Sequence, residues 1–132
     1  MQFLSTLLFI SGAAASIIAC RGSAVCGSDP GASVQTIHDQ VQSLVANGGA
    51  SKKFETNQQI ACSQTTDQSF CAFYTNGGSG TAQNALQQLQ NLMNHGCKKC
   101  GSVPSGSSPN GADGLLTVNW VKDACCQGNC HC

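Results

Sequence analysis

Residues 58–75 read QQIACSQTTDQSFCAFYT, and this stretch decides how the middle of the chain folds. Residues 58–64 and 69–75 look like two strands, and the polar segment 65–68 between them has the composition of a turn. We therefore expect an antiparallel hairpin. A symmetric pairing about this turn places Cys62 opposite Cys71.

The same register places Ile60 opposite Phe73, on one apolar face with the two cysteines. Directly opposite Cβ atoms lie about 4.5–5.5 Å apart, and a disulfide needs roughly 3.5–4.5 Å, which a non-hydrogen-bonded pair can meet. We predict a Cys62–Cys71 disulfide across the hairpin. A slip in register by one residue would destroy this pairing.

Two amphipathic helices are expected, one on each side of the hairpin. Apolar residues recur at helical spacing over about 32–47, where Asp29 and Ser33 are candidate N-caps. The pattern returns over about 81–95, and Gly96 is suited to end that helix.

Short strands are expected at about 97–103 and 115–121, with a loop or short strand at 51–57 and a loop at 104–113. Two helices and about five strands in mixed order predict an α+β fold. More specifically, we expect a small disulfide-rich α/β sandwich, with two antiparallel helices packed on an antiparallel sheet of about five strands.

The chain begins with the features of a secretory leader. Residues 1–16 read MQFLSTLLFISGAAAS, an apolar run followed by small residues at Ala13 and Ala15. The run is shorter than the roughly 20 residues that a membrane helix needs. We expect a cleaved signal peptide at 1–16 and one secreted, extracellular domain at 17–132.

Cysteine usage supports an oxidising compartment. All 10 cysteines follow the leader: Cys20, Cys26, Cys62, Cys71, Cys97, Cys100, Cys125, Cys126, Cys130 and Cys132. An even number in a short chain behind a leader predicts a disulfide framework, in which each bridge adds about 2–4 kcal/mol. The tail from about 122 is cysteine-rich, and the pairing of its four cysteines stays open.

Charge and motifs exclude several classes of function. Charged residues make up 9% and the formal net charge is zero, so the strong basic field of a nucleic-acid binder is absent. The C-x-x-C at 97–100 follows a predicted helix, whereas a redox motif would begin one. Zinc held by this pair and by 130–132 is an alternative that secretion disfavours.

Nothing in the sequence forms a recognisable catalytic motif. The serine-hydrolase pattern G-x-S-x-G does not occur, and the few carboxylates are scattered along the chain. We therefore expect no enzymatic activity, no cofactor and no metal.

The basic residues offer a candidate binding surface. If Cys20 or Cys26 pairs with Cys97 or Cys100, three cations gather at one end of the molecule. These are Arg21, Lys98 and Lys99; ordinary solubility charge is the alternative explanation for them.

Three separated stretches resemble a known family, the fungal killer toxins of the killer protein 4 type. Residues 20–27 read CRGSAVCG and fit the family's C-R-G-S-x-x-C-G. Residues 89–102 read LQNLMNHGCKKCGS, similar to N-L-V-N-H-G-C-R-x-C-G-S, and residues 116–121 read LTVNWV, similar to L-T-V-N-Y-V. The resemblance implies an α/β sandwich and two bridges that join its first two blocks, Cys20–Cys97 and Cys26–Cys100.

The resemblance also implies an activity. Toxins of this family inhibit susceptible fungal cells by blocking calcium uptake, and related proteins are candidate effectors of plant-associated fungi. Activity in the family is tied to a basic side chain two residues before a central cysteine, a position that falls on Ile60 here; Lys52 and Lys53 could supply the charge from a nearby loop.

The binding residues we expect are therefore Arg21, Lys52, Lys53, Lys98 and Lys99. The expected partner is a membrane protein of another cell, with a calcium channel as the implied target, and not nucleic acid; the protein itself is expected to be a monomer. The alternative is a non-toxic secreted effector or binding module with a host protein or glycan as its partner.

Overall fold

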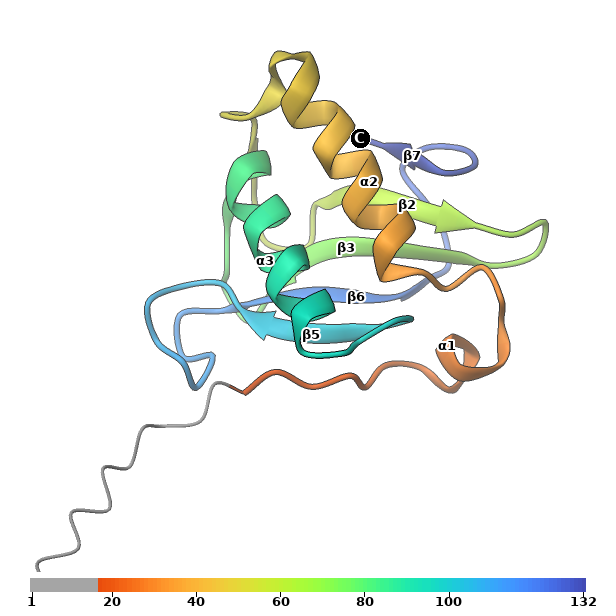
Figure 1. Ribbon diagram of the computed structural model, residues 1–132, viewed down its shortest axis with the longest axis horizontal. Helices are drawn as coiled ribbons and strands as arrows, with labels where there is room; N and C mark the ends of the chain where they lie inside the picture. The colour runs from red at the N-terminus through yellow and green to blue at the C-terminus, as the bar shows by residue number, and fades with distance from the viewer. Residues whose placement is uncertain (1–16) are drawn as a thin grey trace, which may run out of the picture.

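A five-stranded antiparallel sheet is the base of the fold in a computed structural model that describes residues 17–132 (Figure 1). The predicted leader at 1–16 lies outside the described residues. The strands lie in the order β5-β6-β3-β2-β7. Their bounds are β2 Gln59–Gln64, β3 Ser69–Thr75, β5 Gly101–Pro104, β6 Leu115–Val121 and β7 Cys130–His131.

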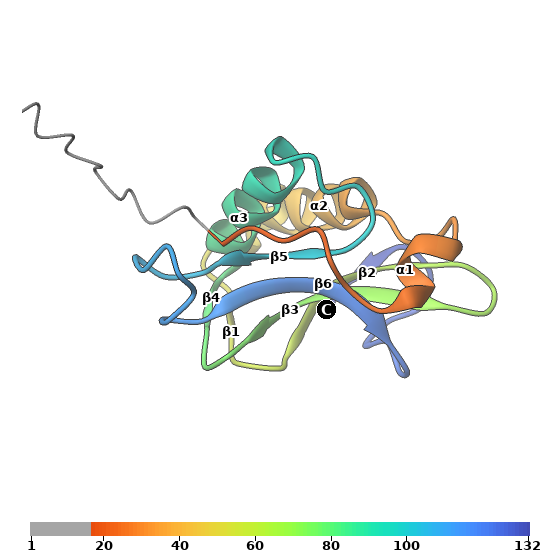
Figure 2. The ribbon, with the colours of Figure 1, turned by 90° about the horizontal axis from the view of Figure 1, so that it is seen from below.

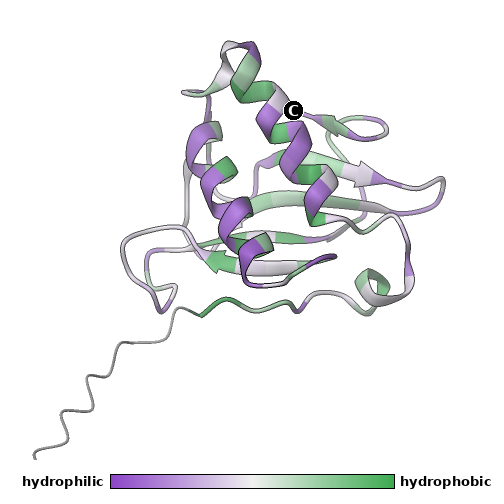
Figure 3. Ribbon diagram, in the orientation of Figure 1, coloured by the Kyte–Doolittle hydropathy of each residue, from purple (hydrophilic) through white to green (hydrophobic). Residues whose placement is uncertain are grey.

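Two antiparallel helices cover one face of this sheet, as predicted (Figures 1 and 2). They are α2 (Val34–Leu44) and α3 (Ala82–Asn94), and their apolar stripes pack into one core with the sheet. Figure 3, which is viewed from the helix side, shows many hydrophilic residues along both. The α+β sandwich expected from the sequence is confirmed.

Helix boundaries follow from local capping chemistry. The Ser33 hydroxyl accepts a hydrogen bond from the amide of Thr36 at 3.1 Å, so α2 begins just after Ser33. Thr81 and Asn84 form a reciprocal capping box at the start of α3. Gly96, with φ of 99°, follows its end.

Several short elements were not expected, although one strand falls in the segment 51–57, where a loop or short strand was predicted. Helix α1 (Ala24–Ser28) has only five residues, which is too short for any periodic pattern to show. Beyond α2 the chain continues into the wider turn η1 (Val45–Gly49), where Gly48 has φ of 92°. A separate two-stranded ribbon pairs β1 (Lys53–Phe54) with β4 (Gly80–Thr81).

The central hairpin has the predicted turn but a different register at its open end. Cys62 lies opposite Cys71, whereas Gln59 and not Ile60 lies opposite Phe73, because an irregularity between Gln59 and Ala61 adds one residue to β2. The predicted Ile60–Phe73 pairing is therefore wrong. The bulge lets Ile60 and its neighbour Ala61 both enter the core, each with 0% of its surface exposed.

The strand expected at 97–103 begins only at Gly101. The preceding residues form a loop, and the carbonyl of Lys98 accepts a hydrogen bond from the amide of Val34 at 2.9 Å. The cysteine-rich tail contributes the short strand β7, in which Cys130 lies opposite Cys62 of β2.

A buried polar chain ties β3, α3 and the loop after β5 together. The Tyr74 hydroxyl donates to Gln88 Oε1 at 2.8 Å, and Gln88 Nε2 donates to the Ser105 carbonyl at 2.8 Å. Burial raises the pKa of Tyr74 to about 12. Within residues 17–132, no helix has both the length and the apolar character that crossing a membrane requires.

Five disulfides cross-link the chain: Cys20–Cys97, Cys26–Cys100, Cys62–Cys71, Cys125–Cys132 and Cys126–Cys130. The first two are the pairs that the family resemblance implies, and the third is the cross-strand pair expected from the hairpin. The last two supply the pairing of the tail, which the sequence left open.

Candidate functional site

Two disulfides bind the N-terminal segment to the loop after α3. Cys20–Cys97 and Cys26–Cys100 span 77 and 74 residues of sequence, and they lie on either side of Arg21 in the chain. Just before them, Ala19 and Ser102 exchange backbone hydrogen bonds of 3.0 and 2.7 Å. These links place distant parts of the sequence side by side at one end of the molecule.

Gly22 allows the close contact between these two segments. A Cβ at this position would lie 2.8 Å from Cys100 Cβ, 2.9 Å from Asn119 Oδ1 and 2.9 Å from Cys26 Sγ. The next residue, Ser23, donates its amide to Asn119 Oδ1 at 2.8 Å, which fixes the segment against β6. Its hydroxyl accepts from the amide of Val25 at the start of α1.

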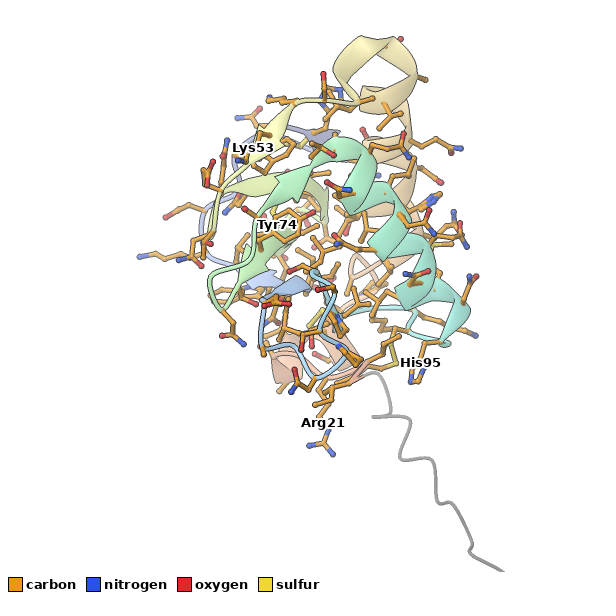
Figure 4. All side chains as sticks on the ribbon, turned by 90° about the vertical axis from the view of Figure 1, so that its left-hand side faces the viewer. Arg21, Lys53, Tyr74 and His95 are labelled. Atoms are coloured by element: carbon orange, nitrogen blue, oxygen red, sulfur yellow. A yellow bond between two sulfur atoms is a disulfide. The ribbon has the colours of Figure 1, made fainter. Side chains whose placement is uncertain are left out.

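An open depression of about 630 Å³ lies between the two segments. It is lined by Cys20, Arg21, Gly22, Ser23, Ala24, Cys26, Gly27, Gly96, Lys98, Lys99 and Cys100. Among these described residues, three are basic and exposed, and none is acidic. Figure 4 shows the Arg21 side chain extending outward at this end of the molecule.

The Lys99 ammonium is held in place by the backbone. It donates to the carbonyls of Gly27 and Asp29, both at 3.4 Å. These carbonyls lie at the end of α1, where acceptors carry the partial negative charge of the helix terminus. We call the surface formed by Arg21, Lys98 and Lys99 the cationic end.

A second, smaller depression of about 340 Å³ adjoins the first at Lys98. Its lining comprises Ser33, Gln35, Met93, Cys97 and Lys98. Lys98 thus lies between an N-terminal depression and one at the ends of α2 and α3. The contributions of Ser33 and Met93 could not be found from sequence, because they depend on how the two helices pack.

The other two candidate residues lie elsewhere. Figure 4 shows Lys53 and Arg21 at opposite ends of the molecule. Lys52 donates to the backbone carbonyl of Cys132, and its ammonium lies 5.2 Å from the centre of the Phe54 ring. The five predicted binding residues therefore form two separate groups, and only three of them border the depressions.

The C-x-x-C segment has no bond between its own cysteines. Cys97 and Cys100 each pair with a cysteine of the N-terminal segment. This arrangement differs from a redox motif, whose two sulfurs bond to each other. It also commits both sulfurs, so in this oxidised form they are not available as the thiolate ligands that zinc requires.

Four other sulfur atoms gather behind β2. The Sγ atoms of Cys62, Cys125, Cys126 and Cys132 all lie within 4.8 Å of one another. Each belongs to a disulfide, so the oxidised protein presents no thiolates here. One disulfide lies within the hairpin and two lie within the tail, so the tail is held against β2 by packing of these sulfurs, by the β2–β7 pairing and by hydrogen bonds such as that from the Cys125 amide to Gln59 Oε1.

The chemistry available at the cationic end is recognition. Guanidinium and ammonium groups bind carboxylates and phosphates, and at neutral pH they provide no nucleophile or general base. The fold and this surface define a class: a small cross-linked α+β protein that presents a positively charged surface held by disulfides.

Comparison with known proteins gives the family. The sequence model of the Kp4 family matches residues 3–122, and the chain belongs to this family. Among its relatives is the KP4 killer toxin of Ustilago maydis P4 virus, which is 36% identical over 108 residues, or 80% of each chain.

Proposed function

We propose that this protein is a secreted killer toxin-like protein that inhibits calcium uptake through channels of competing or host cells. Membership of the Kp4 family and similarity to a killer toxin support the toxin-like character. The leader predicted at 1–16 and the five disulfides support secretion into an oxidising environment.

The observation that carries this proposal is the gathering of Arg21, Lys98 and Lys99 at one end by two long-range disulfides. Cation channels commonly carry rings of acidic side chains along the ion path. Because the formal net charge of the whole chain is zero, a cationic end makes the charge distribution asymmetric, and this asymmetry would orient the molecule toward such a ring. The rigid cross-linked backbone limits the conformational entropy lost on docking.

Calcium uptake by intact fungal and plant cells tests the proposal. The mature protein with native disulfides should reduce uptake of radioactive calcium and slow growth, and excess external calcium should relieve the growth inhibition. Inhibition that excess calcium leaves unchanged, or growth arrest with normal calcium uptake, would contradict the channel-block mechanism.

A second candidate is a non-toxic secreted effector or binding module. Ile60 favours it, since this residue occupies the position at which the family resemblance expects a basic side chain, and it is fully buried. Under this alternative the folded protein leaves growth and calcium uptake unchanged. In a pull-down from host extract, the wild-type protein should then retain a host protein or glycan that the Lys98→Ala/Lys99→Ala variant does not retain.

A further inference from the structure

The two depressions that meet at Lys98 combine apolar surface with positive charge. The larger one has Ala24, three half-cystines and three glycines between its cations, and the smaller one adds Met93. A small hydrated anion would satisfy the cations but would leave this apolar surface unused. A ligand that matches both features carries carboxylates next to apolar side chains.

The extent of the surface favours a chain-like ligand. Lys98 lines both depressions, so a ligand that spans them contacts the N-terminal segment, the Cys97–Cys100 loop and the ends of α2 and α3. The larger depression, at about 630 Å³, has the size of sites that hold several side-chain groups. An extended peptide segment has the required length and can alternate acidic and apolar positions.

The surface is also fixed before any ligand arrives. Cys20–Cys97 and Cys26–Cys100 constrain its backbone, and Gly22 packs against Cys100. Lys99 is already bonded to two carbonyls. Binding to such a surface orders few protein groups, so modest charge complementarity can yield measurable affinity.

We propose that this surface binds an acidic peptide segment with interspersed apolar side chains, of the kind that an extracellular loop of a membrane protein can present. The inference rests on the proposed function for its biological setting, and it names the chemistry of the partner's contact. Anionic lipid headgroups are the competing ligand, which the test separates.

Nuclear magnetic resonance on the full-length mature chain, labelled with ¹⁵N, tests the inference. The probe is a synthetic peptide that alternates Asp or Glu with Leu. The control peptide carries Asn or Gln in place of each Asp or Glu. We expect saturable amide shifts concentrated at residues 21–27 and 96–100 with the acidic peptide, and none with the amide peptide.

The chain offers a matched control for the charges. Lys98→Gln/Lys99→Gln should weaken binding of the acidic peptide about 3- to 10-fold, as expected for two exposed charges. Lys52→Gln/Lys53→Gln removes the same charge from the opposite end and should leave affinity within about 2-fold. Lys98→Gln alone repeats the test without disturbing the bonds of Lys99 to the backbone.

Equal weakening by the two double variants, or shifts spread over the whole surface, would overturn the inference. Binding of the same residues to phosphatidylserine vesicles, without binding of the peptide, would assign the surface to lipid headgroups instead. If the peptide binds here while the wild-type protein leaves calcium uptake unchanged, the surface stands and the proposed function fails. If inhibition of calcium uptake depends on Lys98 and Lys99 but the peptide does not bind, the proposed function stands and the peptide inference fails.

Discussion

Gly22 shows how a single missing side chain permits the contact between two distant segments. Alanine at this position would place its Cβ within 3 Å of Cys100, Asn119 and Cys26, none of which can move freely. We expect Gly22→Ala to lower the free energy of unfolding by about 1–3 kcal/mol, as overpacking in a tight site does. Urea unfolding with the disulfides intact measures it.

Gly27 is the matched control, because a Cβ there meets nothing within 4 Å and the residue lies in α1. Gly27→Ala should leave stability unchanged or raise it slightly, since alanine is the better helix former. Equal losses in the two variants would show that the glycines matter for a reason other than space.

Burial of Tyr74 should make the free energy of unfolding fall at high pH. Its pKa is raised to about 12 by burial, whereas the unfolded chain titrates near 10, so between these values the folded state holds a proton that the unfolded state has lost. The contribution is complete below about pH 10 and is lost as pH rises toward about 12, by up to roughly 2–3 kcal/mol.

The difference between wild type and Tyr74→Phe isolates the contribution of this residue from every other effect of high pH on stability. Denaturant unfolding at several pH values from about 8 to about 12 covers the range in which a tyrosine titrates. The free energy of unfolding should fall more steeply with pH for wild type than for Tyr74→Phe. Parallel declines would contradict the assignment. At pH 8, Tyr74→Phe should itself cost about 1–3 kcal/mol, because Gln88 Oε1 loses its donor.

At the scale of elements, the β2 bulge separates two roles that lie close in sequence. Ile60 and Ala61 enter the core, while Cys62 bonds to Cys71 on the outer face. Simple alternation predicts one face for Ile60 and Cys62, and one inserted residue changes this. No pattern in the local sequence marks the bulge, which shows only in the pairing of β2 with β3.

A substitution at Ile60 tests what this burial means for the family's basic position. Ile60→Lys would place an ammonium where no surface is exposed, and we expect it to lower the free energy of unfolding by about 4 kcal/mol or more. Ile60→Val should cost only about 0.5–1.5 kcal/mol. A lysine variant that folds with wild-type stability would contradict this view of the site.

Elements with strong patterns were predictable, and those defined by tertiary contacts were not. Strand β6 begins and ends where the alternation of Leu115 to Val121 places it, and α3 follows its apolar stripe and capping residues. Helix α1 and strand β7 are each five residues or fewer and depend on disulfides. Such short segments have no period to detect.

At the scale of the whole molecule, the candidate site depended on covalent pairing. The proximity of Arg21 to Lys98 and Lys99 could be anticipated once Cys20 and Cys97 were paired, because the basic residues adjoin those cysteines in sequence. The separation of Lys52 and Lys53 from these three residues could not be anticipated, because no cysteine lies close to the two lysines in the sequence. Long-range disulfides therefore carry positional information that periodicity does not.

The length of the chain that each bridge encloses should decide how much it stabilises the fold. Cys20–Cys97 spans 77 residues and Cys125–Cys132 spans 7. Loop-closure entropy then predicts a loss of about 4–5 kcal/mol for Cys20→Ser/Cys97→Ser and about 2–2.5 kcal/mol for Cys125→Ser/Cys132→Ser. Urea unfolding of the two variants, with peptide mapping to confirm that the remaining four pairs are native, compares these losses. Equal losses would mean that native contacts around each bridge, and not restriction of the unfolded chain, set its contribution.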